Sequence, residues 1–219
     1  MGGAYLNKRF TCRINPDRIK TIFECGSRDG LDALALWEFF NPERMFIFEC
    51  NPESIPICKQ NIQQHPQIKL IEKAVYHAEG TIPFYPTDME KSKDKNIGAS
   101  SLLWHRDNKQ EFFQKEIRVE STRLDTVMQQ EGVETIDLLC MDVQGVEIDV
   151  LEGLGEKIAK VQYIITEVVF EHYYAGDYLF SEVRKWLSSK GFDLLIGSGA
   201  LGNRTTGLTD CLFKNKKRV

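Results

Sequence analysis

Acidic residues and glycines occur together at three points of the sequence, each beside a short apolar run. Glu24, Gly26 and Gly30 belong to the run TIFECGSRDG, Glu49 ends the run MFIFE, and Asp142 follows IDLLCM. A glycine turn frees backbone N–H groups at the start of a helix, and a carboxylate beyond the next strand accepts hydrogen bonds from ribose hydroxyls. This pattern predicts a nucleoside-binding site.

The residues of the first turn indicate which nucleoside it would bind. A dinucleotide fingerprint needs three glycines as G-x-G-x-x-G, but Arg28 occupies the middle position here. The Arg28 side chain would crowd a pyrophosphate and the Glu24 carboxylate would repel one, whereas a carboxylate attracts a sulfonium and an amino-acid tail. The turn therefore favours S-adenosylmethionine over a nicotinamide dinucleotide. A tight turn that binds no ligand is the alternative.

Short apolar runs alternate with amphipathic stretches, which is typical of a parallel sheet with helices on both faces. The strands are expected at Thr21–Cys25, Met45–Glu49, Ile68–Ile71, Ile136–Met141, Val161–Glu167, Phe192–Ile196 and Thr209–Phe213. The helices are expected at Leu31–Phe40, Pro52–Gln64, Leu124–Gln130, Glu147–Leu154 and Tyr178–Lys190. Asn51 and Pro52 have the residue types of an N-cap and a first helical position, so they are expected to open the second helix.

One long segment interrupts this alternation. Residues 87–116 are mostly polar, but they include Leu102, Leu103 and Trp104. A polar insertion of this length in a compact chain is usually a lid or a binding loop, so we expect a loop that covers the substrate, with an inert excursion as the alternative. The whole chain, 1–219, is expected to form one domain with an N-terminal lead-in at 1–18 and a basic tail at 214–219.

The segment from Asp142 to Glu147 carries a family resemblance. It reads Asp-Val-Gln-Gly-Val-Glu and resembles the Asp-x-Glu-Gly-x-Glu signature of FkbM-type methyltransferases, with Gln144 where the family usually has Glu. The resemblance spans roughly residues 19–213. It implies a Rossmann-like class I methyltransferase fold, in which a mostly parallel seven-stranded sheet has helices on both faces and an antiparallel last strand.

The resemblance also implies roles for individual residues. The first turn would hold the methionine part of S-adenosylmethionine, Glu49 the ribose and Ala74-Val75 the adenine, and Ser101 would lie at the rim of the active site. Asp125, at a helix start, would be a structural cap. The full cofactor-binding set expected is Glu24, Gly26, Arg28, Gly30, Glu49, Asn51, Ala74, Val75, Ser101 and Asp142.

Three residues near the carboxyl ends of the fourth and fifth strands are the catalytic candidates. His172 is the preferred general base, because imidazole titrates near neutral pH, with Asp142 and Glu167 beside it. His105 in the insertion is the rival base, and a surface or structural role is the alternative for either histidine. Asp142, Glu167 and His172 could together bind a divalent ion such as Mg²⁺ or Mn²⁺, although nothing in their spacing requires one.

These observations predict an S-adenosylmethionine-dependent O-methyltransferase. Family analogy favours a sugar hydroxyl of a glycan or glycoconjugate as the acceptor. The alternatives are a small-molecule natural product as acceptor, a nicotinamide-dependent oxidoreductase, and a nucleoside-binding module without catalysis. Methyltransferases that modify amino groups of nucleic acids typically carry Asn/Asp-Pro-Pro-Tyr where this chain has Asp142-Val-Gln-Gly145, which disfavours that class.

Composition narrows the partners and the compartment. The 219 residues carry a net charge of −4, which provides no basic field for a nucleic acid. Six cysteines without a Cys-x-x-Cys pair favour a reducing compartment over a disulfide or zinc scaffold. No apolar run is long enough to span a membrane, so a cytoplasmic protein is expected. The sequence gives no indication of the oligomeric state.

Overall fold

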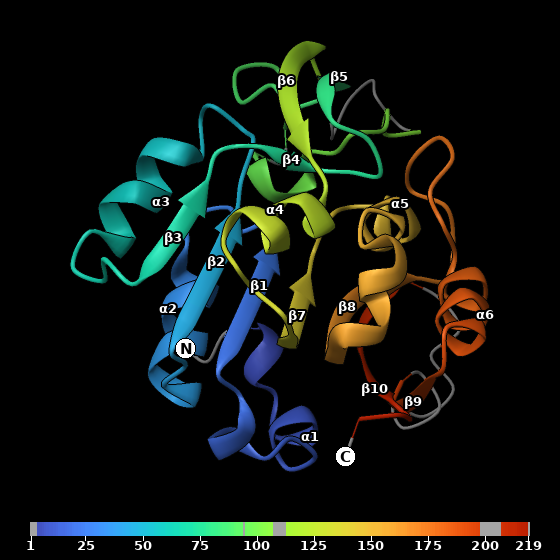
Figure 1. Cartoon of the computed structure of the whole chain (residues 1–219). Helices are drawn as coiled ribbons and strands as arrows, with labels where there is room; N and C mark the ends of the chain where they lie inside the picture. Colours follow the sequence, from blue (N-terminus) through green and yellow to red (C-terminus); the bar gives the residue numbers. More distant parts are fainter. Residues whose placement is uncertain (1–3, 94, 107–112, 198–206, 219) are drawn as a thin grey trace.

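Two β-sheets make up the strand framework of the computed structural model, which describes residues 4–93, 95–106, 113–197 and 207–218. The larger sheet has seven strands in the order β3-β2-β1-β7-β8-β10-β9 (Figure 1). Its strands are β1 (Thr21–Cys25), β2 (Arg44–Phe48), β3 (Ile68–Ile71), β7 (Ile136–Met141), β8 (Val161–Val169), β9 (Phe192–Ile196) and β10 (Leu208–Asn215).

The direction of the strands confirms the predicted Rossmann-like architecture. Strands β3, β2, β1, β7 and β8 are parallel, and the last strand, β10, runs antiparallel to both β8 and β9. All seven predicted strands are present, with end shifts of one or two residues. Strand β10 reaches Asn215, which is buried, so the predicted basic tail at 214–219 begins later than expected. The extent of the domain, 1–219, stays a prediction.

Helices cover both faces of the larger sheet (Figure 1). They are α1 (Lys8–Thr11), α2 (Leu31–Phe40), α3 (Ile55–Ile62), α4 (Leu124–Gln130), α5 (Glu147–Glu152) and α6 (Phe180–Ser189). Short 3₁₀ turns lie at η1 (Ala4–Leu6), η2 (Pro16–Arg18), η3 (Ile97–Ala99) and η4 (Gly155–Lys160). None of the helices in the described part of the chain combines the length and the apolar character needed to cross a membrane.

The alternation of side chains along the central strands explains the two helical layers. In β2, Phe46 and Phe48 point into the core shared with α4, α5 and α6, whereas Met45 and Ile47 point into the core shared with α1, α2 and α3. Strands that are buried on both faces read as continuous apolar runs, which is why they were recognisable in the sequence. The larger sheet is therefore the rigid base on which the residues after each strand are placed.

The predicted start of the second helix is wrong. Helix α3 begins at Ile55, three residues later than expected, and Asn51-Pro52 belongs to a preceding turn. The Asn51 side chain accepts a hydrogen bond from the Glu53 backbone N–H at 3.0 Å, which closes an Asx turn. Asn is as favourable for that turn as for an N-cap, so residue type alone did not separate the two.

A second, three-stranded sheet lies beyond the carboxyl ends of β1 and β2, at the top of Figure 1. It has the order β4-β6-β5, from β4 (Ala74–Val75), β5 (Gly80–Phe84) and β6 (Ile117–Thr122). No pattern in the sequence predicted this sheet. Residues 94 and 107–112 of the predicted insertion lie outside the described residues, and the rest of that segment connects β5 to β6.

Candidate active site

A cavity lies between the carboxyl ends of the central strands and the small sheet, and it encloses about 850 Å³ when the solvent-open space at its mouth is included. The walls come from the turn after β1, the loop after β2, strand β4, the 97–102 segment and the loop after β7. Of the predicted cofactor residues, those lining it are Gly26, Arg28, Glu49, Asn51, Ala74, Val75, Ser101 and Asp142. Open α/β sheets bind ligands at this edge, so its position agrees with the sequence prediction.

The turn after β1 and the loop after β7 are in direct contact at Gly26. The Asp142 backbone N–H donates to the Cys25 carbonyl at 3.0 Å, and the Gly26 N–H donates to Phe48 at 3.0 Å. Gly26 has φ of +84°, and a Cβ there would lie 1.9 Å from the Asp142 carbonyl oxygen. Only glycine permits this approach, so Gly26 fixes the distance between the predicted methionine-binding turn and Asp142.

Two residues of the predicted cofactor set, Glu24 and Gly30, do not line the cavity. Gly30 has φ of +77° and its Cα faces helix α3, where a Cβ would lie 3.0 Å from the Cys58 sulfur. Glu24 is 1% exposed and is hydrogen-bonded to the Ser27 hydroxyl beneath the turn. Burial raises the pKa of Glu24 to about 8. Because Glu24 is enclosed beneath the turn and does not line the cavity, its contact with the cofactor stays a prediction.

Glu49 is held by three backbone N–H groups. One carboxylate oxygen accepts from Cys50 and Asn51, and the other accepts from Arg28, each at 2.7 Å. Burial raises the pKa of Glu49, and these hydrogen bonds oppose that effect by stabilising the charged form. A carboxylate offers about four acceptor positions, so one remains for a ligand. The geometry leaves room for a contact between Glu49 and one ribose hydroxyl.

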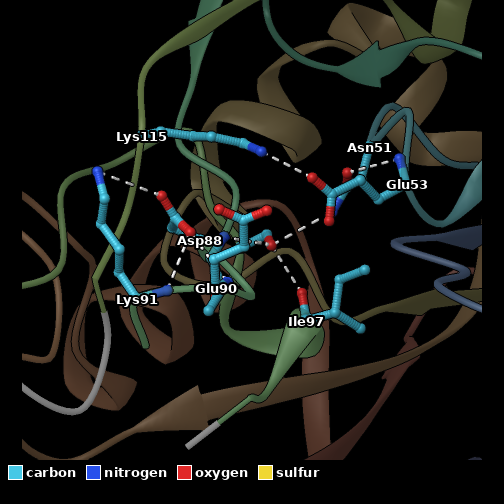
Figure 2. A network of polar contacts seen from close by, with 9 residues as sticks. Asn51, Glu53, Asp88, Glu90, Lys91, Ile97 and Lys115 are labelled. Atoms are coloured by element: carbon cyan, nitrogen blue, oxygen red, sulfur yellow. Dashed lines mark hydrogen bonds and ion pairs between the residues drawn. The ribbon is translucent and has the colours of Figure 1, made fainter. Parts of the chain in front are cut away.

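A polar network ties the 97–101 segment to the loop after β2 (Figure 2). The Asn51 amide donates to the Ser100 hydroxyl at 3.4 Å, and that hydroxyl donates to the Ile97 carbonyl at 2.7 Å. Nearby, the Lys115 ammonium forms an ion pair with Glu53 at 2.7 Å. The insertion therefore lies over one side of the cavity. Its role as a cover for the substrate stays a prediction.

The predicted adenine contact lies in an apolar part of the wall. Ala74 and Val75 form β4 and are both buried, and the cavity is lined beside them by Phe48, Phe84 and Leu102. Aromatic and aliphatic side chains offer a purine ring a dry surface. This end of the cavity suits a flat apolar base, with Glu49 a short distance along the same wall.

Asp142 and Glu167 lie next to each other because of the register between β7 and β8, in which Met141 pairs with Thr166. The Gln144 amide connects the two carboxyl groups, donating to Asp142 at 2.5 Å and to Glu167 at 3.1 Å. Burial raises the pKa of Asp142, while the Gln144 hydrogen bond opposes the shift. Burial, followed by the charge of Asp142, raises the pKa of Glu167 to about 8.

His172 does not join this pair. The exposed side chain lies on the loop after β8, and its Nδ1 atom is 2.5 Å from the buried Asp177 carboxylate, which also accepts from the Tyr173 and Tyr174 N–H groups. The predicted metal-binding group of Asp142, Glu167 and His172 is therefore not formed. In the described residues, the one His/Cys/Asp/Glu group with ligand atoms close enough for a metal ion is His77, Asp149 and Glu152.

The rival base, His105, is buried in the insertion. Its backbone N–H donates to Gln114 at 2.6 Å, and its ring packs edge-on against Tyr174 with 5.1 Å between centroids. The environment of His105 is that of a packed side chain between two loops. The general-base roles of both histidines stay predictions, and the geometry places carboxyl groups, not imidazoles, at the cavity.

Two loops form the rim beyond the acid pair. The Arg106 N–H donates to the Tyr173 carbonyl and the Ala175 N–H donates to the Trp104 carbonyl, both at 2.8 Å, so the insertion pairs with the loop after β8. Trp104 is 37% exposed and stacks on Tyr85 with 4.3 Å between ring centroids. This rim offers an aromatic surface next to hydrogen-bonding groups.

Several residues at the site were not given a role by the sequence analysis. Gln144 was recognised only as a departure from a signature. Tyr5, within the predicted lead-in, is 3% exposed and lines the cavity. Asp125, predicted as a cap, is bound mainly by the Arg123 guanidinium. The position of Gln144, two residues after the strand-end acid Asp142, could have indicated a contact with that acid. Nothing in the sequence indicated that Tyr5 would line the cavity.

Comparison with known proteins gives consistent results. Residues 24–194 match the methyltransferase FkbM domain. The chain is 31% identical over 165 residues to the 2-O-methyltransferase NoeI of Sinorhizobium fredii (strain NBRC 101917 / NGR234), an alignment that covers 74% of this chain and 67% of that protein.

Two solved structures resemble the fold at low sequence identity. Fibrillarin from Aeropyrum pernix with natively bound S-adenosyl-L-methionine has a TM-score of 0.53 at 11% identity, over 91% of this chain and 68% of that one. Magnesium protoporphyrin IX methyltransferase from Synechocystis PCC 6803 with bound SAM has a TM-score of 0.52 at 9% identity, over 94% of this chain and 74% of that one. These likenesses show the fold.

Proposed function

The chain belongs to the FkbM family of S-adenosylmethionine-dependent methyltransferases, and we propose that it transfers the methyl group to a sugar hydroxyl. The observation that carries the proposal is the Asp142–Glu167 pair, which places one carboxyl group on the wall of the cavity and a second one next to it on the neighbouring strand. Oxygen acceptors need a base for the hydroxyl proton, and carboxylates can serve as that base.

The residues around the cavity fit S-adenosylmethionine. The apolar wall at Ala74 and Val75 suits adenine, and Glu49 keeps one acceptor position for a ribose hydroxyl. The Asp142 carboxyl group lines the cavity next to the Gly26 turn, so a cationic sulfonium bound beside it gains a favourable electrostatic contact. Arg28, with φ of +48°, occupies the place where a dinucleotide fingerprint needs glycine.

The chemistry requires little beyond positioning and one proton acceptor. S-adenosylmethionine supplies an activated methyl group, so the acceptor oxygen bonds to the methyl carbon as the carbon–sulfur bond breaks and its electron pair stays on sulfur. Asp142 takes the hydroxyl proton, because it is the member of the Asp142–Glu167 pair that lines the cavity. Orientation of the reactants supplies an effective molarity of about 10⁵ M or more, and a positioned base supplies roughly 10²–10⁴-fold.

The rim supports a sugar as the acceptor. The exposed Trp104 side chain stacks on Tyr85, and this pair resembles the flat apolar surfaces on which sugar rings stack. NoeI is a 2-O-methyltransferase, which supports oxygen as the receiving atom. We place the activity in the cytoplasm and on glycans or glycoconjugates, not nucleic acids.

The proposal is tested with ¹³C-methyl-labelled S-adenosylmethionine and a panel of mono- and oligosaccharides, with a phenol and a primary amine as comparison acceptors. Release of S-adenosylhomocysteine measures turnover, and the ¹³C chemical shift of the product separates O-methyl from N-methyl groups. We expect an O-methyl sugar product and loss of turnover in Asp142→Asn. Turnover only with the phenol would indicate a small-molecule natural product as the acceptor, and an N-methyl product would overturn the proposal.

A further inference from the structure

Gln144 lies on a loop whose backbone is fixed at several points. Its φ is +51°, in the left-handed region, and its carbonyl accepts a hydrogen bond from the Ser101 hydroxyl at 2.7 Å. The next N–H, of Gly145, donates to the buried Glu147 carboxylate at 3.0 Å. A non-glycine residue with positive φ costs conformational energy, so these contacts hold a strained backbone in place. The side chain of Gln144 therefore starts from a defined position.

Each polar group of the Gln144 amide has a partner. Its nitrogen carries two hydrogens and donates one to Asp142 at 2.5 Å and one to Glu167 at 3.1 Å. Its oxygen accepts from the Tyr174 hydroxyl at 2.8 Å, and Tyr174 is 4% exposed. The Tyr174 hydroxyl is also 3.0 Å from the Ala99 carbonyl, which anchors it to the insertion. The amide orientation is set by this buried phenol.

The charges around the acid pair are mostly negative. Asp210 of β10 is opposite Glu167 in the register, and the other ionisable groups that act on the pair are Glu147, Asp32 and Arg28. Arg28 is the one cation among them, and its side chain is half exposed. Like charges at this separation oppose ionisation of both carboxyl groups together. A neutral amide donor stabilises a carboxylate without adding another charge.

We propose that Gln144 is a positioning residue that keeps Asp142 ionised and Glu167 protonated, so that the carboxylate facing the cavity is the one able to accept a proton. The shorter hydrogen bond goes to Asp142, which favours its charged form over that of Glu167. The inference rests on the proposed function, since it assumes that Asp142 takes the acceptor proton. It gives the departure from the family signature at this position a chemical role.

The two carboxyl groups can be observed without any acceptor. The ¹³C resonances of the Asp and Glu side-chain carboxyl groups are followed against pH, and those of the pair are assigned with Asp142→Asn and Glu167→Gln. In the unsubstituted protein, Asp142 should titrate at a lower pH than Glu167. In Gln144→Met, which keeps the length but removes the donor, the Asp142 midpoint should rise by about one pH unit, the equivalent of one charge-assisted hydrogen bond.

A second variant and a control make the result decisive. Tyr174→Phe removes the hydroxyl that orients the amide, so the Asp142 midpoint should rise by a smaller amount; this variant decides the matter if Gln144→Met does not fold. Gln129→Met, on the exposed face of α4, should change neither midpoint. In turnover assays, the acidic limb of the kcat profile should move with the Asp142 midpoint.

Unchanged midpoints in both folded variants, or Glu167 titrating below Asp142 in the unsubstituted protein, would overturn the assignment of Gln144. Failure to methylate any sugar would leave the titration result standing, because the titration uses the protein alone. The failure of the proposed function and the failure of this inference are therefore separate outcomes.

Discussion

Replacing Glu49 by Gln probes the cofactor site at its best-defined contact. The carboxylate accepts three backbone hydrogen bonds of 2.7 Å, from Arg28, Cys50 and Asn51. Gln has nearly the same size, but one of its two terminal atoms is an NH₂ group that can only donate. Whichever way the amide is oriented, at least one backbone N–H then faces another donor. The turn after β1 and the loop after β2 lose part of their connection.

The size of the effect follows from these contacts. Leaving one buried N–H without an acceptor costs about 1–3 kcal/mol of folding stability. Losing the charged acceptor for a ribose hydroxyl costs about 1.5–3 kcal/mol of binding free energy, which corresponds to a roughly 10- to 150-fold rise in Kd. Glu49→Gln should therefore lower both the folding stability and the affinity for the cofactor, because the carboxylate accepts the backbone hydrogen bonds of the free protein and also contacts the bound ligand.

Isothermal titration with S-adenosylmethionine and with S-adenosylhomocysteine measures the binding effect, and urea unfolding measures the stability effect. Glu38→Gln is the matched control, since Glu38 lies on the exposed face of α2. Its Kd should equal that of the unsubstituted protein. The reasoning is refuted if Glu49→Gln binds both ligands as tightly as the unsubstituted protein, or if Glu38→Gln weakens binding equally.

Three further changes test other parts of the structure by urea unfolding. Gly26→Ala places a Cβ 1.9 Å from the Asp142 carbonyl oxygen at φ of +84°, so the free energy of unfolding should fall by about 3 kcal/mol or more. The control Gly132→Ala, at φ of +60° in open space, should lower it by about 1 kcal/mol, and equal losses would contradict this expectation. Burial raises the pKa of Glu24 from 4.5 to about 8, so the folded protein holds this proton more tightly than the unfolded chain does. Its free energy of unfolding should therefore fall as the pH rises between those values, by at most about 4–5 kcal/mol. Glu24→Gln should remove this dependence of stability on pH, and an unchanged dependence would refute the reasoning. The Thr87 hydroxyl is buried without a partner among the described residues, so Thr87→Val should raise stability by about 1 kcal/mol, and a loss would contradict the structure there.

The larger sheet could be predicted from the sequence because its central strands are buried on both faces. Apolar runs such as Ile136–Met141 and Val161–Val169 leave little choice of local structure, and their alternation with helices implies parallel pairing. The antiparallel direction of β10 came from the family resemblance. No local feature of Leu208–Asn215 specifies its direction, which depends on its pairing with β8.

The small sheet could not be predicted for reasons of length and composition. Strand β4 has two residues, Ala74 and Val75, which is too short for any periodicity. Strand β5 begins at Gly80 and contains Pro83, residue types that argue against a strand. Both strands depend on pairing with β6, which lies 42 residues or more from β4 in the chain. Such pairings are a property of tertiary structure.

The candidate site likewise contains residues whose position could be predicted from the sequence and residues whose position could not. Residues placed by strand ends, such as Gly26, Glu49 and Asp142, were predicted because the carboxyl ends of parallel strands share one edge. The burial of Glu24 and the Asp177 partner of His172 could not be predicted, because both depend on packing. Linear sequence gives the type of a residue after a strand, but it does not give the direction of its side chain.

The central claim is that the cavity lined by Gly26, Glu49 and Asp142 binds S-adenosylmethionine, with the ribose at Glu49 and the adenine against Val75. A crystal structure of the protein with S-adenosylhomocysteine tests it most directly. We predict one ribose hydroxyl within hydrogen-bond distance of the Glu49 carboxylate, the base on the apolar wall, and the sulfur facing the Asp142 side of the cavity. A nucleoside bound elsewhere, or bound here with its ribose away from Glu49, would contradict this account.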